Sequence, residues 1–190
     1  MISKKSIKYL LSYQYISDIL YDKYNEERIY KSKVSNLILL SHIEYLYRYN
    51  TRLIDSNISL KHPKLGIRLS IDDSSYNDIG LINHTYKIYT SISSSKISSK
   101  INKLADENNV YLSGKEKRII SETVNRFNKE YNAISMERTI IHLSNKFSKS
   151  NKQKKELNEN NIVEVFDKKN VKSVYKTKLK EYKNRKRGNK

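Results

Sequence analysis

The chain has 190 residues, no cysteine and a formal net charge of +18 at pH 7. The length suits one ordinary domain with an extension, and the absence of cysteine excludes disulfides, thiolate metal sites and thiol catalysis. The positive charge favours a polyanionic partner, either nucleic acid or an anionic membrane surface, whereas the sequence holds no apolar run of about 18 residues that would span a bilayer.

Residues 1–60 are predicted to form a helical N-terminal extension. Apolar residues from Ile7 to Leu20 recur at intervals of three and four, which is the spacing of a helix with one apolar stripe. From Val34 to Leu46 the apolar residues occupy more than one face, which indicates a helix buried by neighbours or by a partner. The tyrosines of this segment are expected at the edges of the apolar stripes, with packed rings and solvated hydroxyl groups.

Residues 61–147 are predicted to form a helical core domain. Its first part, residues 61–83, holds the only proline, two of the four glycines and a short strand candidate with the sequence IRLSI. Beyond this part the apolar spacing predicts three helices, around residues 97–104, 120–127 and 136–147.

A capping box marks the start of the second of these helices. Ser113 is followed three residues later by Glu116, so each side chain can bind the backbone N–H of the other and begin a helix near Gly114. The alternation of helices and loops indicates a compact helical body. We therefore expect a mainly α fold with a helical N-terminal extension and an extended basic C-terminal arm.

Residues 148–190 are that predicted basic arm. The apolar periodicity stops after Phe147, and residues 146–190 carry 16 Lys and Arg against 5 Asp and Glu. Because little here builds a core, we expect the arm to become ordered only on a partner. Cations with interleaved tyrosines suit phosphate contacts and base stacking, and the arm lacks the apolar face of an interfacial membrane helix. We therefore favour nucleic acid over a membrane.

A serine-rich stretch, YTSISSSKISSKINKL at residues 89–104, is the candidate phosphate-binding turn. Hydroxyls and free N–H groups at the start of a helix bind phosphate well, and Lys96, Lys100 and Lys103 lie on roughly one side of the predicted helix. The alternative is a flexible serine linker beside a solvated lysine face. This stretch by itself leaves both interpretations open.

The predicted RNA-binding residues are serines of the turn, lysines of the helix that follows it and cations of the arm. They are Ser93, Ser94, Ser95, Lys96, Lys100, Lys103, Lys149, Lys152, Lys154, Lys155, Lys176, Lys178, Lys183, Arg185, Lys186 and Arg187.

Residue patterns typical of catalysis are weak. The four histidines are far apart, and none has a carboxylate or a second histidine at metal-ligand spacing. Asp72 and Asp73 suit a metal-dependent nuclease but more often serve as turn and cap residues. The sequence contains no phosphate-binding glycine loop and no nucleophile elbow. We therefore predict a protein that is not an enzyme and has no metal site, no cofactor and no small-molecule substrate.

The order of these segments resembles the bacterial-type small-subunit ribosomal protein of the thirteenth family. The likeness covers roughly residues 67–147, with a looser likeness in the arm. It rests on Thr90-Ser91-Ile92, on the Lys-Ser-Lys-type helix at 96–101, on the capped helix near 120–127 and on Ile134-Ser135-Met136 before the third helix. Where the family has a glycine-rich turn, this chain has three serines at 93–95. Its stretch after the third helix is rich in lysine rather than in arginine, histidine and glycine.

The resemblance implies a helical body with a helix-two-turns-helix unit and a long basic arm. It also implies a structural role in the head of the small subunit, with contacts to head rRNA, to neighbouring ribosomal proteins, to the large subunit across a bridge and to the P-site tRNA. Residues 1–60 have no counterpart in the family, and we expect them to pack on a neighbouring ribosomal protein.

Residue usage predicts an A/T-rich genome. Ile, Lys, Asn, Tyr and Phe, which have A/T-rich codons, make up 91 of the 190 residues, whereas Ala, Gly and Pro make up 7. Together with the resemblance, this usage predicts a mitochondrial ribosomal protein encoded in the organelle. Three alternatives stay open: another organellar ribosomal protein, a DNA-binding protein of an A/T-rich plasmid or phage whose second helix enters the major groove, and a nuclease or maturase fragment that uses Asp72 and Asp73.

Overall fold

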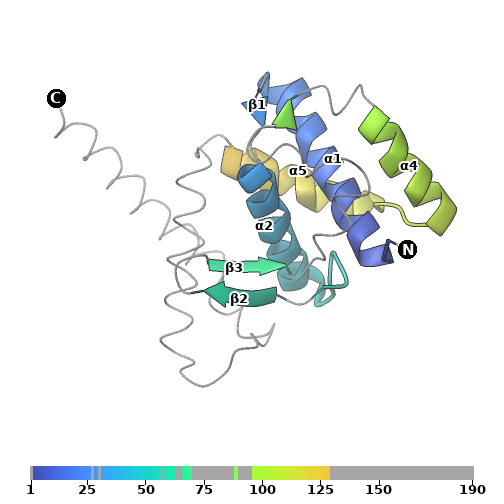
Figure 1. Ribbon diagram of the computed structural model, residues 1–190. Coiled ribbons are helices and arrows are strands. Elements are labelled where there is room, and N and C mark those ends of the chain that lie inside the picture. The colour runs from blue at the N-terminus through green and yellow to red at the C-terminus, as the bar shows by residue number, and fades with distance from the viewer. Residues whose placement is uncertain are drawn as a thin grey trace, which may run out of the picture.

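The computed structural model describes residues 2–26, 28–29, 31–56, 58–62, 66–69, 88–89 and 96–128. Within these ranges the predicted mainly α fold is confirmed (Figure 1). The elements in chain order are α1 (Lys4–Tyr24), β1 (Arg28–Ile29), α2 (Lys31–Tyr49), β2 (Ile58–His62), β3 (Gly66–Leu69), β4 (Ile88–Tyr89), α4 (Lys96–Asn108) and α5 (Gly114–Asn128). The predicted third helix at 136–147 and the arm at 148–190 lie outside the described residues.

A serine caps the start of α1 and an asparagine caps its end. Ser3 has an extended backbone, and its hydroxyl accepts a hydrogen bond from the N–H of Ser6 at 3.3 Å. At the other end Asn25 has a positive φ of 51°. Its N–H and that of Glu26 donate to carbonyl groups of the last helical turn. The bond from Asn25 to Tyr21 is that of an αL-type stop, in which a left-handed residue turns the chain out of the helix.

Asparagine ends two further helices in the same conformation. Asn50 after α2 and Asn109 after α4 also have a φ of 51°. The Asn50 N–H donates to the carbonyl of Leu46 at 2.8 Å, and the N–H of Val110 donates to the carbonyl of Ala105 at 3.0 Å. Glycine is the usual residue at such stops because most L-residues are strained at positive φ. In this chain, which has only four glycines, asparagine takes that position.

The predicted capping box starts α5. The N–H of Ser113 donates to the Glu116 carboxylate at 2.7 Å, and the N–H of Glu116 donates to the Ser113 hydroxyl at 3.3 Å. Because both end groups are satisfied in this way, the helix begins at Gly114, where the sequence pattern places it. The predicted helix around residues 97–104 is confirmed as α4.

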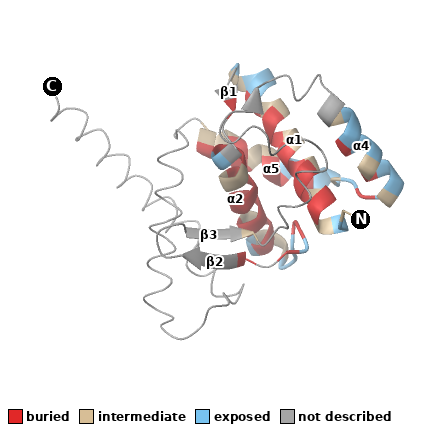
Figure 2. Cartoon of the chain, viewed as in Figure 1, coloured by how far each residue is buried: buried red, intermediate tan, exposed pale blue. Residues whose placement is uncertain are grey.

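One hydrophobic core joins all four of these helices. Leu10 of α1 and Leu37 of α2 cluster with Ile101 of α4 and Ile120 of α5. Helix α1 contacts each of the other three helices, and Figure 1 shows it between α2 and α4. The helices predicted as an extension therefore share their core with helices of the predicted core domain. Their apolar stripes face this internal core, as the burial colours of Figure 2 show, rather than a neighbouring protein.

Two small antiparallel sheets accompany the helices. Strand β2 pairs with β3, with a register irregularity between Leu60 and His62, and β1 pairs with β4. The β2–β3 hairpin lies against α2 (Figure 1). The predicted IRLSI strand is confirmed where it is described, because β3 includes residues 67–69.

The predicted helical character of residues 1–60 is confirmed for α1 and α2, but not at the short strand β1 and not after Asn50. The chain bends there and then enters β2 at Ile58. Leu53 and Ile54 are nevertheless buried, at 2% and 0% exposure. An apolar pattern indicates that residues are buried but not that they are helical. Here Leu53 and Ile54 pack in the core from a non-helical segment.

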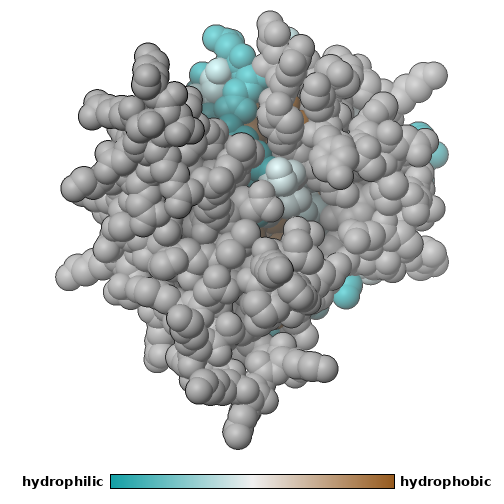
Figure 3. All heavy atoms as spheres, turned by 60° about the vertical axis from the view of Figure 1, so that its left-hand side comes forward, coloured by the Kyte–Doolittle hydropathy of each residue, from teal (hydrophilic) through white to brown (hydrophobic). Residues whose placement is uncertain are grey.

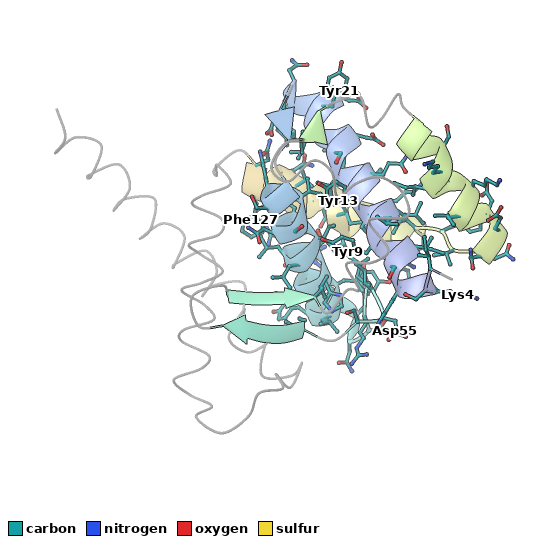
Figure 4. The ribbon with its side chains drawn as sticks, in the orientation of Figure 1. Lys4, Tyr9, Tyr13, Tyr21, Asp55 and Phe127 are labelled. Carbon is teal, nitrogen blue, oxygen red and sulfur yellow. The ribbon has the colours of Figure 1, made fainter. Side chains whose placement is uncertain are left out.

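The expectation that tyrosine hydroxyls are solvated is wrong for Tyr13. This side chain is 2% exposed, and its hydroxyl has no hydrogen-bond partner among the described residues. Burial raises its pKa well above the usual value. Tyr9 packs beside it with ring centroids 6.4 Å apart, and the Tyr9 hydroxyl donates to Ser35 at 3.0 Å. In Figure 4 both rings lie among the helices, whereas Tyr21 points outward near the end of α1.

Candidate nucleic-acid interface

Three of the predicted RNA-binding residues, Lys96, Lys100 and Lys103, belong to the described part of the chain, and all three lie on α4. The serines of the predicted turn at residues 93–95 and the predicted cations of the arm lie outside the described residues. Of the predicted site, the structure therefore describes only the lysines on α4.

That face of α4 carries both signs of charge. Lys100 and Lys103 are exposed, but so are Asp106 and Glu107 near the end of the same helix. The Lys103 amino group lies 3.8 Å from the Glu107 carboxylate. Figure 2 shows most of the outer side of α4 as exposed, while Ile101 packs inward on the core. Lys100 and Lys103 are thus accessible, but two carboxylates share their surface.

The first two turns of α5 expose cations and no acid. Glu116, the one acidic residue there, is 6% exposed and points inward. Its carboxylate caps the helix and forms an ion pair with Lys8 of α1 at 2.7 Å. From Ile119 to the end of the helix every residue is buried or half-buried. The exposed cations of this helix are Lys115, Lys117 and Arg118.

Two of these lysines lie over tyrosine rings of the neighbouring helices. The Lys115 amino group is 5.7 Å from the ring centroid of Tyr49 on α2, and the Lys117 amino group is 5.9 Å from that of Tyr15 on α1. The Tyr15 hydroxyl is hydrogen-bonded with Ser121 at 3.0 Å, which fixes the ring against α5. Cation–π attraction orders an ammonium group while leaving its N–H donors available.

An ion-pair network engages the carboxylates between α2 and α5. Arg48 contacts Glu44 at 2.8 Å and Glu122 at 2.6 Å. Arg118 contacts Glu122 at 2.9 Å, and Arg126 contacts Glu44 at 3.3 Å. The hydrogen bonds from Arg118 and then Arg48 lower the pKa of Glu122 below its usual value. Since three arginines surround two carboxylates, the network itself keeps a positive charge.

Sequence reasoning missed the exposed lysines of α5. In the sequence SGKEKR at residues 113–118, Glu116 stands among three cations and offsets part of their charge. The missed signal is the capping box itself. A glutamate that caps a helix turns back to the helix start, so the lysines on either side of it stay without a carboxylate beside them.

Nothing in the described residues forms a metal site: no group of three or more His, Cys, Asp or Glu is close enough to hold an ion. His42 is a core residue whose Nδ1 accepts a hydrogen bond from the N–H of Ile54 at 3.4 Å. Burial, with a further contribution from the Arg52 cation, lowers its pKa to about 4, so the ring is neutral at pH 7. Asp72 and Asp73, the acidic pair of the nuclease alternative, lie outside the described residues.

The described surface is mainly polar on the side drawn in Figure 3, where hydrophilic colours predominate and hydrophobic areas are small. Among the described helices, none combines the length and the apolar character needed to cross a membrane.

Comparisons with family models, with curated protein sequences and with solved structures find no match to this chain.

Proposed function

We propose that the protein is a structural rRNA-binding protein in the head of the small subunit of a mitochondrial ribosome. The observation that carries this proposal is the distribution of charge, because +11 of the net +18 falls in residues 146–190. A chain with this charge repels itself unless a polyanion neutralises it, and binding such a partner stabilises the folded state. The resemblance to the thirteenth family favours the ribosome, and the A/T-rich residue usage favours an organelle.

The helical body supports an RNA partner through its accessible cations. Its carboxylates Glu44, Glu116 and Glu122 are all engaged in ion pairs within the chain. Lysines on α4 and α5 are exposed on the same body. Because these three carboxylates are engaged within the chain, they do not compete with phosphate for the exposed lysines of α5. The proposed role needs no catalysis and no cofactor, and its further partners are neighbouring ribosomal proteins, the large subunit and the P-site tRNA.

The burial of α5 favours RNA over the DNA-binding alternative. The recognition helix of a helix-turn-helix protein lies in the major groove with its N-terminal residues on base edges, and homeodomain and zinc-finger helices present side chains over about two turns. Helix α5 is the second helix of the α4–α5 pair, but it packs on both α1 and α2. Its exposed residues end at Arg118, so the rest of the helix, which packs on α1 and α2, is not free to lie in a major groove.

Sedimentation of a native extract tests the proposal. The protein is followed by mass spectrometry through a sucrose gradient, with and without RNase. We expect it to migrate with the small ribosomal subunit and to leave that fraction after RNase treatment. Migration as free protein, or with DNA in a manner that RNase does not change, would reject the ribosomal function.

A further inference from the structure

We propose that the start of α5 and the two tyrosines beside it form the surface through which the helical body grips the phosphate backbone of RNA. We call this the lysine–tyrosine surface and define it by Lys115, Lys117, Tyr15 and Tyr49. The inference rests on the proposed function, since it takes RNA as the partner. It goes further by assigning the contact to α5, which the sequence did not single out, and by naming the phosphodiester backbone as the group that is bound.

The first argument is the availability of the two amino groups. Neither Lys115 nor Lys117 forms an ion pair with any other described residue. Within the part of the chain that the structure describes, no carboxylate has to be displaced for a phosphate to reach them. On α4, by contrast, Lys103 has Glu107 beside it at 3.8 Å, and a phosphate there meets the repulsion of that carboxylate. We therefore expect two lysines on α5 to bind phosphate more tightly than two lysines on α4.

The second argument is order. A free lysine loses about 2 kcal/mol of rotamer entropy when it is immobilised. Lys115 and Lys117 already lie over ring faces in the unbound protein. The Tyr15 ring is fixed by its hydrogen bond with Ser121, and the Tyr49 ring packs on Tyr45 with centroids 4.8 Å apart. A cation–π contact at an exposed site is worth about 0.5–1 kcal/mol, so these contacts offset part of the entropy that the two lysines lose when they bind phosphate.

The third argument is the arrangement around the helix. Lys115 faces α2 and Lys117 faces α1, so the two lysines flank the outward side of α5. Gly114 lies at the helix start and is exposed, and a Cβ built on it meets no atom within 4 Å. Arg118, with 71% of its side chain exposed, follows on the same turn. A polynucleotide strand laid across this start meets a cation on each side and an open backbone in the middle.

The chemistry of the surface favours RNA over an anionic membrane. An interfacial membrane helix carries a broad apolar face opposite its cations. The apolar face of α5, which includes Ile119, Ile120 and Val124, is fully buried in the protein core. The remaining exposed residues of its first turns are cationic or lack a side chain. Phosphate contacts are therefore available, but insertion into lipid is not.

A charge-matched pair of double variants tests the inference in the full-length chain. Lys115→Gln with Lys117→Gln changes the lysine–tyrosine surface, and Lys100→Gln with Lys103→Gln removes the same charge from α4. Binding of a single-stranded RNA oligonucleotide is measured over a range of salt concentrations. We expect the α5 variant to lower the log–log salt slope by about 1.4, which corresponds to two lost phosphate contacts on a single strand. The α4 variant should lower it by a smaller amount.

Four outcomes would overturn the inference. A salt slope of the α5 variant equal to that of the unchanged protein, or an equal or larger effect of the α4 variant, rejects the lysine–tyrosine surface while the RNA-binding function stands. Failure of the unchanged protein to bind RNA in a salt-dependent way rejects both proposals. Loss of binding to phosphatidylserine vesicles by the α5 variant, with RNA binding intact, assigns the surface to a membrane instead.

A ring variant separates positioning from charge. Tyr15→Leu leaves the net charge unchanged but removes the ring beneath Lys117. We expect weaker RNA binding with an unchanged salt slope, and Tyr15→Phe, which keeps the ring, should restore most of the affinity. Far-UV circular dichroism and thermal melting of each variant establish that the helical body remains folded. An affinity that Tyr15→Leu leaves unchanged would show that the ring has no positioning role.

Discussion

Lys8 of α1 and Glu116 of α5 form an ion pair of 2.7 Å near the N-terminal ends of the two helices, although the Glu116 side chain is only 8% exposed. The same carboxylate accepts the N–H of Ser113 at 2.7 Å. One residue therefore starts a helix and connects it to another helix more than 100 positions earlier in the chain. A buried pair of this kind is costly to break from one side, since the remaining charge loses its partner.

We predict that removing the Glu116 charge destabilises the body. Glu116→Gln keeps an acceptor for the helix cap but leaves Lys8 unpaired, and we expect a loss of about 1–3 kcal/mol in the free energy of unfolding. Urea denaturation of Glu116→Gln, Lys8→Gln and the double variant measures the coupling. Strictly additive effects of the two single changes would show that the pair contributes nothing.

The asparagine helix stops provide a second prediction. Asn109 has a φ of 51°, so Asn109→Ala is expected to lower the free energy of unfolding by about 1 kcal/mol, because alanine is strained in that region. Asn109→Gly should leave the stability equal or higher, since glycine adopts this conformation freely. Thermal melts of the two variants, compared with the unchanged protein, check this order. A more stable alanine variant would contradict the assigned stop.

Acid sensitivity should trace to His42. Its pKa is lowered from 6.5 to about 4 in the folded chain, so below pH 6.5 the unfolded state takes up a proton that the folded state does not. Stability therefore falls as the pH drops from 6.5 toward 4, and between pH 7 and pH 5 the loss is about 2 kcal/mol. Urea midpoints at both pH values measure it.

A substitution at the same position is the control for this pH effect. His42→Gln removes the titration, and we expect its stability to change much less between pH 7 and pH 5. The lowered pKa of Glu122 acts in a separate window, because that contribution is present above its usual value of 4.5 and is lost only as the pH falls below it. An equal pH dependence in His42→Gln would assign the effect to other groups.

Deletion of residues 168–190 tests the predicted arm. This segment carries a large share of the cations but belongs to none of the described helices. We expect the truncated chain to bind RNA more weakly and with a smaller salt slope, while its far-UV helicity and melting cooperativity stay unchanged. Loss of cooperative melting would instead show that the segment contributes to the folded body.

Local signals in the sequence determined where the helices of the body lie and where one of them begins. The apolar spacing in residues 7–20 and 97–104 and the Ser113–Glu116 pair each depend on contacts between residues three or four positions apart. Such contacts form within one helix whatever surrounds it, so these predictions are confirmed. The helix stops escaped notice because asparagine, rather than glycine, adopts the left-handed conformation here.

Tertiary packing alone decided how these helices share a core and which charges remain available. Lys8 of α1 forms an ion pair with Glu116 of α5, and Arg48 of α2 forms one with Glu122 of α5. The rings beneath the lysines of α5 belong to two different helices, Tyr15 to α1 and Tyr49 to α2. Each contact joins residues far apart in the chain, and no local pattern encodes such a pairing. The sequence predicts α1 and α2 as a separate extension because their contacts with α5 are long-range. In the structure they form one hydrophobic core with α5.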